Sequence, residues 1–336
     1  MPTATASFGL RLLEQLGSRE VVLSPASIQN AFVTLRPAVT GATRAALDTI
    51  PDPELRPIDD EGVVLELAQA AWVDHRVRLL ADLGIDVFAL DFGSPEAPER
   101  VNAWASEKTH GMVPRIIDAF AGAEVFALTD AAYFDGSWQV PFDPAQTESR
   151  PFTLPGGDTV DVPTMHAYGE YEYYEDDAIQ ALRLPYGNQR EVCFTAVIAR
   201  EGLGPPRIDD WDVLQTRKRS GSIAVPRFSA QSQLELSDAL TALGLGPAFA
   251  ISSDWAGLIG GAAGISRVLH GARVDVDEQG TRAAAVTAVI LELSAAYGGA
   301  PFDLRLDRPF LWAVENRLTG TILFLGIVTD PREEST

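Results

Sequence analysis

The segment from Gly280 to Pro301 constrains the fold of this chain more than any other, because its pattern fits no ordinary helix or strand. Its first residues are mostly alanine, which favours a helix, but the residues after Ala285 include β-branched side chains that favour a strand. Small side chains alternate along its first half and could fit into a sheet. Two interpretations follow: a buried helix that enters a loop at Gly298, or a segment that can be either loop or strand.

The chain before this segment alternates irregularly between helical and strand patterns. Apolar residues from Phe8 to Leu16 have helical spacing, and Gly17 stops that helix. Ser24 followed by Pro25 predicts a second helix start, since serine caps a helix and proline at the first helical position leaves no amide unpaired. Residues 98–117 indicate a third, interrupted helix.

Strand patterns are longest at 63–73 and 125–134. The acidic, proline-broken connection from Pro51 to Gly62 is typical of a surface loop. Because no repeat and no low-complexity linker divides the chain, we expect one large mixed α/β domain that spans residues 1–336. Hairpin patterns occupy residues 152–162 and 171–184.

Composition excludes several classes of partner. The formal charge is −21, from 47 acidic and 26 basic side chains, and no run of basic residues could form a phosphate-binding surface. We therefore expect no nucleic acid or polyanionic sugar as a partner. No stretch approaches the ~18 apolar residues of a membrane span, and the N-terminus lacks the pattern of a signal peptide, so no membrane association is expected. Cys193 lies in an apolar run that predicts a buried, inert thiol.

The sequence also lacks the motifs of enzymatic chemistry. Its histidines have no pair at metal-ligand spacing, and it contains no glycine-framed serine and no phosphate-binding loop. We therefore expect neither catalytic activity nor a metal or other cofactor. The histidines considered are His75, His110, His166 and His270.

Motifs near the C-terminus resemble those of a known family. Residues Val274–Ala285 resemble the hinge of the reactive-centre loop of the serpins, a family of serine protease inhibitors. Residues Leu306–Trp312 and Thr319–Gly326 look like the signature strands of that family at the expected distance downstream. The resemblance covers nearly the whole chain and is closest to a compact, bacterial type of inhibitory serpin. It extends through Ser24–Ile28, Asn102–Trp104, Ala131–Trp138, Val162–Met165 and Ile265–His270.

The resemblance implies a mixed α+β fold with three β-sheets, about eight or nine helices and an exposed reactive-centre loop at about 278–303. It implies a monomer that acts as a suicide substrate. A serine protease would attack the loop, form an acyl-enzyme and be trapped covalently when the cleaved loop inserts into the central sheet.

The hinge of that loop carries both supporting and conflicting residues. Its small or family-typical members are Glu278, Gly280, Thr281, Ala283, Ala284 and Ala285. Arg282 and Val286 depart from the acidic and small residues that are usual at their positions. These departures leave open a non-inhibitory serpin that acts as a protease substrate, a carrier or a chaperone.

The position of the scissile bond differs with the way the loop is counted. The family's usual spacing from Gly280 places the bond at Ser294–Ala295, whereas counting back from Pro309 gives a bond nearer Gly298. The alternatives are therefore Leu293–Ser294 and Tyr297–Gly298. For all of them, no lysine or arginine lies between Arg282 and Arg305. We expect elastase-, chymotrypsin- or subtilisin-like targets, because trypsin-like pockets require a cationic side chain.

Two polar clusters match positions that govern sheet opening in the family. The shutter would consist of Ser24, Ser27, Asp130 and His270, although Ser24 could serve only as a helix cap. The breach would consist of Trp138, Arg227 and Glu278, with an Arg227–Glu278 ion pair holding it shut. Asp130 stands where the family usually has asparagine, so it could form an ionised pair with His270. This predicts a shutter whose stability depends on pH between roughly 5 and 8.

A sulfated-sugar activator such as heparin is not expected. The connection from Pro51 to Gly62 is short and acidic where many relatives carry a longer, sometimes basic helix, and residues 200–210 also look trimmed. The single cysteine and the missing signal pattern are compatible with a bacterial or intracellular protein, and an extracellular location stays open.

Overall fold

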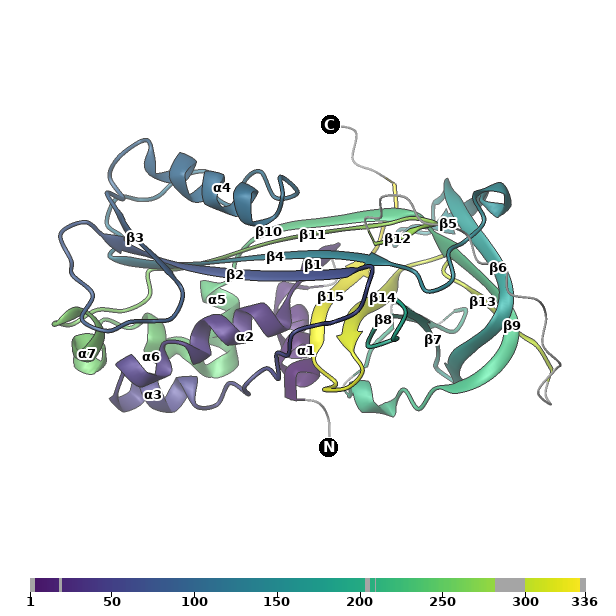
Figure 1. Cartoon of the computed structure of the whole chain (residues 1–336), viewed down its shortest axis with the longest axis horizontal. Coiled ribbons are helices and arrows are strands. Elements are labelled where there is room, and N and C mark those ends of the chain that lie inside the picture. The colour runs from purple at the N-terminus through teal and green to yellow at the C-terminus, as the bar shows by residue number, and fades with distance from the viewer. Residues whose placement is uncertain (1–3, 18–19, 203–205, 209, 282–299, 333–336) are drawn as a thin grey trace.

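The computed structural model describes residues 4–17, 20–202, 206–208, 210–281 and 300–332. The molecule is elongated, and a six-stranded sheet runs along its length (Figure 1). Most helices lie against one face of this sheet, whereas α4 (Ala97–Lys108) lies on the other face. A second sheet begins beneath the first and curves round one pole of the molecule.

Two helices begin or end at the residues that the sequence predicted. α1 (Ala4–Leu16) ends before Gly17, which has a left-handed φ of 86°. α2 (Pro25–Val33) begins after Ser24, whose hydroxyl accepts a hydrogen bond from the backbone amide of Ser27 at 3.3 Å. The connection 51–62 contains no helix, as its proline-broken sequence predicted. The described residues form seven α-helices besides short 3-10 and π-helical segments. The other α-helices are α3 (Gly41–Leu47), α5 (Ser237–Leu240), α6 (Gly246–Phe249) and α7 (Ala256–Ile259).

The interrupted helix predicted at 98–117 ends earlier than expected. α4 stops at Lys108, and the Thr109 hydroxyl then bonds to the backbone on both sides of the stop. His110 and Gly111 follow with left-handed φ values of 51° and 82°, a conformation that cannot continue an α-helix. The rest of the segment crosses the outer face of the six-stranded sheet without helical structure.

The six-stranded sheet contains both of the long strands that the sequence predicted, β4 (Phe126–Ser137) and β2 (Val63–Asp74). In the centre of the sheet β11 (Arg267–Val276) pairs directly and in parallel with β4. Beyond this pairing the short strand β12 (Gly280–Thr281) lies between β11 and β4. The order of strands is β10 (Phe228–Glu235), β11, β12, β4, β2 and β3 (Asp86–Leu90).

The second sheet has two parts that share one long strand, β6 (Thr159–Glu175). The first half of β6 pairs with β5 (Glu148–Thr153), and its last residues pair with β7 (Ile179–Pro185). The third sheet expected from the resemblance is therefore the set β5, β6, β9 (Arg217–Pro226) and β13 (Phe302–Arg305), which β6 makes continuous with the second sheet. The mixed α+β fold is confirmed. The remaining strands are β1 (Val21–Leu23), β8 (Val192–Ala199), β14 (Phe310–Asn316) and β15 (Ile322–Val328).

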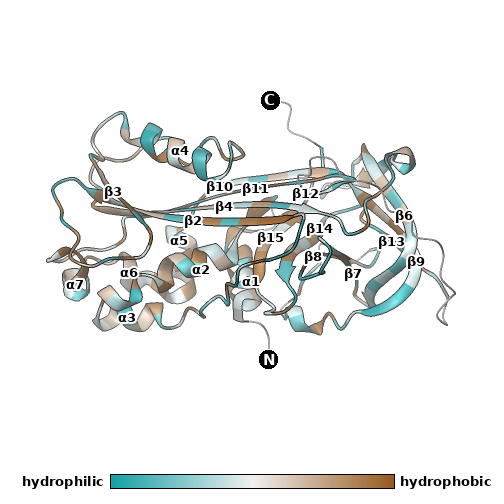
Figure 2. Ribbon diagram, in the orientation of Figure 1, coloured by the Kyte–Doolittle hydropathy of each residue, from teal (hydrophilic) through white to brown (hydrophobic). Residues whose placement is uncertain are grey.

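Buried apolar side chains of the described residues form three clusters: one between most helices and the six-stranded sheet, one between the two sheets, and one between α4 and the outer face of the six-stranded sheet. Figure 2 shows hydrophobic residues along the strands of the sheets. Phe32 and Trp255 belong to the first core, and Phe194 and Trp312 belong to the second. Cys193 is buried beside Phe194, as its apolar run predicted. Among the helices that the structure describes, none has the length and hydropathy needed to cross a bilayer.

Candidate functional site

The contact between β4 and β11 is the central feature of the site, and we call it the seam. It runs from Arg267 opposite Ala127 to Ala272 opposite Ala132. Because these residues are direct hydrogen-bonding partners, no other described strand lies between them. The structure therefore has a seam that is closed along 127–132 and that holds a short strand between β4 and β11 at one end, near Gly136.

This short strand is β12, and Gly280 makes its position possible. Gly280 pairs with Ser137 and Thr281 pairs with Gly136 on β4, while Thr281 also pairs with Val276 on β11. Gly280 has a φ of 151°, and a β-carbon there would collide with the carbonyl oxygen of Gly136. Only glycine fits this close approach of two backbones.

The side chain of Thr281 is held by a residue that sequence reasoning missed. The hydroxyl groups of Tyr186 and Thr281 lie 2.5 Å apart, and both residues are fully buried. Burial raises the pKa of Tyr186 well above its usual value, so the phenol stays protonated. The ring of Tyr186 also stacks on Trp138 at 4.5 Å between centroids. No local sequence signal pointed to Tyr186, because its contact with Thr281 joins residues far apart in the chain.

Two of the predicted breach residues form the expected ion pair next to β12. Arg227 donates to Oε1 of Glu278 from Nε at 2.8 Å and from Nη2 at 2.5 Å, and the Thr147 hydroxyl donates to the same oxygen. The Glu278 side chain is only 6% exposed, whereas that of Arg227 is 44% exposed, so the carboxylate is buried and the guanidinium group faces solvent in part. Burial opposes ionisation of Glu278, but the hydrogen bonds from Arg227 and Thr147 outweigh it and lower the pKa of the carboxyl.

The third predicted breach residue, Trp138, contacts the hinge through the backbone. Its amide donates to the carbonyl of Gln279 at 2.9 Å, and its indole Nε1 donates to the carbonyl of Asp277 at 2.8 Å. The Trp138 side chain has no hydrogen bond or ion pair to Arg227 or Glu278 among the described contacts. It therefore holds the chain on both sides of Glu278 rather than the carboxylate itself.

The four predicted shutter residues lie together in a buried cluster that ties α2 to β4 and β11. The Asp130 carboxylate accepts hydrogen bonds from the Ser27 hydroxyl and from Nδ1 of His270, the latter at 2.5 Å. The Ser24 amide donates to Nε2 of His270 at 3.1 Å. Gln69, on β2, joins the cluster by donating to the Ser27 hydroxyl at 2.8 Å. All five side chains are less than a tenth exposed.

The hydrogen-bond partners of His270 set the roles of its two ring nitrogens. The Ser24 amide N–H points at Nε2, so this nitrogen accepts a hydrogen bond. Nδ1 then donates to Asp130. The predicted contact between Asp130 and His270 is formed, and its ionisation and its dependence on pH stay predictions.

Other predicted site residues lie outside the described part of the chain. These are the hinge residues Ala283, Ala284 and Ala285 and the scissile-bond residues Leu293, Ser294, Ala295, Tyr297 and Gly298. The functions assigned to the hinge, shutter and breach remain predictions.

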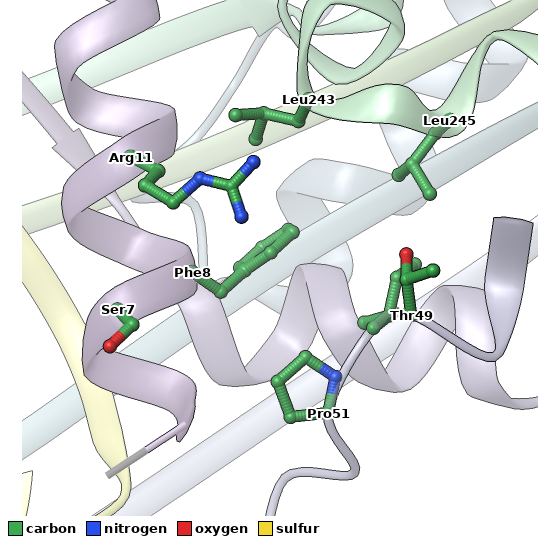
Figure 3. A pocket seen from close by; sticks show the side chains of 8 residues that line it. Ser7, Phe8, Arg11, Thr49, Pro51, Leu243 and Leu245 are labelled. Carbon is green, nitrogen blue, oxygen red and sulfur yellow. The ribbon is translucent and has the colours of Figure 1, made fainter. Parts of the chain in front are cut away.

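A surface pocket of about 300 Å³ lies apart from the seam, between α1 and the helical segment 237–249 (Figure 3). The guanidinium group of Arg11 lines the pocket beside the ring of Phe8 and the side chain of Leu243. Within the described residues, no ion pair involves Arg11. The pocket could hold a small molecule with an apolar body and an anionic group.

Comparison with known proteins gives consistent results along the whole chain. The family model described as serpin (serine protease inhibitor) matches residues 3–331. An uncharacterised serpin-like protein from Thermococcus kodakarensis is 30% identical over 369 residues, which cover 98% of this chain and 85% of that protein.

Solved structures with the same fold are less similar in sequence. A thermophilic serpin, tengpin, in its native state matches with a TM-score of 0.84 and 22% identity, over 98% of this chain and 93% of its own. Thyroxine-binding globulin in complex with thyroxine matches with a TM-score of 0.83 and 22% identity, over 98% of this chain and 99% of its own. At this identity the likeness concerns the fold alone.

Proposed function

This chain belongs to the serpin family, and on that basis we propose that it inhibits serine proteases as a suicide substrate and has no catalytic activity of its own. The observation that carries the proposal is the seam, which is closed along 127–132 but already holds Gly280 and Thr281 at one end. A strand that has begun to enter a sheet can be extended once the chain beyond it is free to move.

The inhibitory reaction would use the chemistry of the protease itself. The protease serine attacks the scissile carbonyl of the loop, the bond to the next residue breaks, and an acyl-enzyme forms. Cleavage frees the loop beyond Thr281 to follow β12 between β4 and β11. The attached protease is carried along, and even ~1 Å of misplacement of its catalytic groups slows deacylation strongly.

The energy of insertion is sufficient for this purpose. Each backbone hydrogen bond of an added strand contributes about 0.5–1.5 kcal/mol net, so a dozen inserted residues release on the order of 10 kcal/mol. That amount is comparable to the whole stability of a typical domain. Distortion of a trapped protease is therefore within reach of loop insertion.

The target class follows from the loop sequence. No lysine or arginine lies between Arg282 and Arg305, and the candidate bonds offer leucine, serine, alanine or tyrosine. Proteases with apolar or small binding pockets accept such side chains, whereas trypsin-like proteases need a cation. We propose an elastase-, chymotrypsin- or subtilisin-like target that binds a monomeric inhibitor.

A second candidate function is that of a non-inhibitory carrier. Arg282 and Val286 support it, because they depart from the residues usual in the hinge of inhibitors. The pocket beside Arg11 also supports it (Figure 3), and the structural neighbour thyroxine-binding globulin is a serpin-fold protein with a bound small molecule. Cleavage without a stable covalent complex would favour this function.

The direct test is to mix the protein with chymotrypsin, elastase and subtilisin separately and to examine the products by denaturing gel and mass spectrometry. We expect a band at the sum of the two masses, and the released peptide will identify the scissile bond. Thr281→Arg should be cleaved without forming this band, because the new charge cannot be buried at a position with no exposure. Thr153→Arg, at an exposed position on β5, is the matched control and should behave like the parent. Clean cleavage of the parent by fully active protease would overturn the proposal.

A further inference from the structure

The surface pocket beside α1 combines an apolar floor with a single cation. Phe8, Ile50 and Leu245 line it, and each of these side chains is less than a tenth exposed, so they belong to the edge of the core. Of the described residues that line the pocket, Arg11 alone is charged, and it is exposed. The pocket therefore offers a ligand an apolar surface and one positive charge.

The guanidinium group of Arg11 is available to such a ligand. Figure 3 shows the Arg11 side chain extending from α1 towards Leu243, beside the ring of Phe8. Within the described part of the chain, this side chain has no hydrogen bond and no ion pair, and Glu14, three residues further along α1, does not pair with it. Its donors are thus free to meet an anionic group.

One wall of the pocket, residues 49–51, is fixed by side chains from α2 and the segment that follows it. Arg36 donates to the carbonyl of Ile50 and to the carboxylate of Asp52. Gln29 donates from Nε2 to the carbonyl of Pro51 at 3.1 Å. Because these bonds hold the backbone of the wall in place, little further ordering is needed when a ligand binds.

Another wall contains a break in a helix. Thr241–Leu245 form a single π-helical turn, and Gly244 within it has a left-handed φ of 98°. A β-carbon at Gly244 would meet no atom within 4 Å, so the backbone angle and not crowding requires glycine there. Residues two apart in a regular helix face different sides, whereas Leu243 and Leu245 both line the pocket. The break therefore builds this wall, and such irregular turns are frequent at functional sites.

Volume and charge limit what the pocket can hold. Its volume of about 300 Å³ is at the lower end of the range for small-molecule sites. At ~30 Å³ for each group of the size of a water molecule, it has room for about ten such groups. The formal charge of −21 repels anions at long range, but salt screens charges beyond about 8 Å, so the nearby charge of Arg11 decides which ligands are attracted.

We propose that this pocket binds a small carboxylate with an apolar body, about ten non-hydrogen atoms in all. The carboxylate pairs with the guanidinium group of Arg11, and the apolar body covers Phe8, Ile50 and Leu245. The inference goes beyond the proposed inhibition, because the pocket lies apart from the seam and its ligand needs no protease. It also gives the second candidate function, that of a carrier, a class of ligand.

The test is calorimetric titration of the uncut protein with octanoate, octan-1-ol and octylammonium. These three probes share one apolar chain and differ in charge. We expect octanoate to bind about tenfold more tightly than octan-1-ol, because only the carboxylate forms a charged pair with Arg11, and octylammonium to bind more weakly than either. Binding of octylammonium as tight as that of octanoate would overturn the inference.

Two substitutions separate the charge from the apolar surface. Arg11→Gln should weaken octanoate binding about tenfold, to the level of octan-1-ol, whereas Arg11→Lys should retain most of the affinity. Ser7→Trp places a large ring at a lining position on α1 and should weaken octanoate and octan-1-ol alike.

Arg78→Gln is the matched control for the charge. Arg78 is also exposed and has no side-chain partner among the described contacts, but it does not line the pocket. Equal affinities of Arg11→Gln and Arg78→Gln for octanoate would overturn the inference. Because no protease is present in these titrations, their outcome is separate from the test of covalent trapping.

Discussion

Asp130 is the residue whose chemistry most distinguishes this shutter. Its carboxylate accepts from the Ser27 hydroxyl and from His270, and His270 in turn accepts from the Ser24 amide. Every donor in this chain of bonds points towards an acceptor only while Nε2 of His270 is unprotonated. A proton on Nε2 would face the Ser24 N–H, so acid should weaken the contact between α2 and the seam.

We therefore predict that the closed sheet is less persistent at pH 5 than at pH 8. On mild heating the parent should convert to latent or polymerised forms more at pH 5, because histidine normally titrates in this interval. Asp130→Asn should respond to pH differently from the parent, since an amide beside Nδ1 of His270 cannot accept and hold the ring proton as a carboxylate does. Asp275→Asn, on the partly exposed end of β11, serves as the control. Native gels and activity measurements give the converted fraction, and equal pH responses of Asp130→Asn and the parent would contradict this prediction.

Among individual residues, the sequence identified those that belong to recognisable motifs and missed those whose contacts join positions far apart in the chain. Ser24, Ser27, Asp130 and His270 all lie within or beside such motifs, and the structure brings them together. Tyr186 stands in an ordinary turn sequence, and its contact with Thr281 depends on how the second sheet packs under the first. The roles of the two ring nitrogens of His270 could not be predicted from sequence either, because they depend on a backbone amide 246 residues away.

β12 is the element on which the mechanism depends, since it is the part of the hinge already between β4 and β11. The backbone of β12 can approach β4 closely because Gly280 has no side chain. Thr281 is held by the contact of its hydroxyl with that of Tyr186. Loss of that contact would leave a buried hydroxyl without its partner, at a cost of about 1–3 kcal/mol.

We predict that Tyr186→Phe loosens β12 while preserving the stack on Trp138. Hydrogen exchange of a peptide containing Gly280 and Thr281 should be faster in Tyr186→Phe than in the parent. Tyr174→Phe removes an exposed hydroxyl that bonds to Asp176 and should leave this exchange unchanged. If both variants exchange at the parent rate in β12, then Tyr186 does not hold the hinge.

Helices and strands with strong local sequence signals were predicted well, but the C-terminal end of α4 was not. The long strands β2 and β4 were expected within a few residues of their actual bounds, and Ser24 with Pro25 marked the start of α2. The end of α4 at Lys108 was not expected, although Gly111, with Lys108 and His110 before it, is a local pattern that indicates the end of a helix.

The described part of the molecule combines a closed seam with a short strand, β12, that lies between β11 and β4 at one end of it. Hydrogen bonds between β4 and β11 must be exchanged for bonds to the inserted loop, so the gain comes from the additional strand. On the proposed mechanism, the native form is less stable than the cleaved form of the same chain. Such metastability would be a property of the complete fold, and only the family resemblance allowed it to be predicted from sequence.

The most direct test of this account is to compare the thermal unfolding of the intact protein with that of the protein cleaved in its loop, in the same buffer. Insertion of a strand that adds about 10 kcal/mol should raise the unfolding temperature by at least ~15 °C. We predict that the cleaved protein unfolds at this higher temperature. Unfolding of both forms at the same temperature would contradict loop insertion and, with it, the proposed mechanism of inhibition.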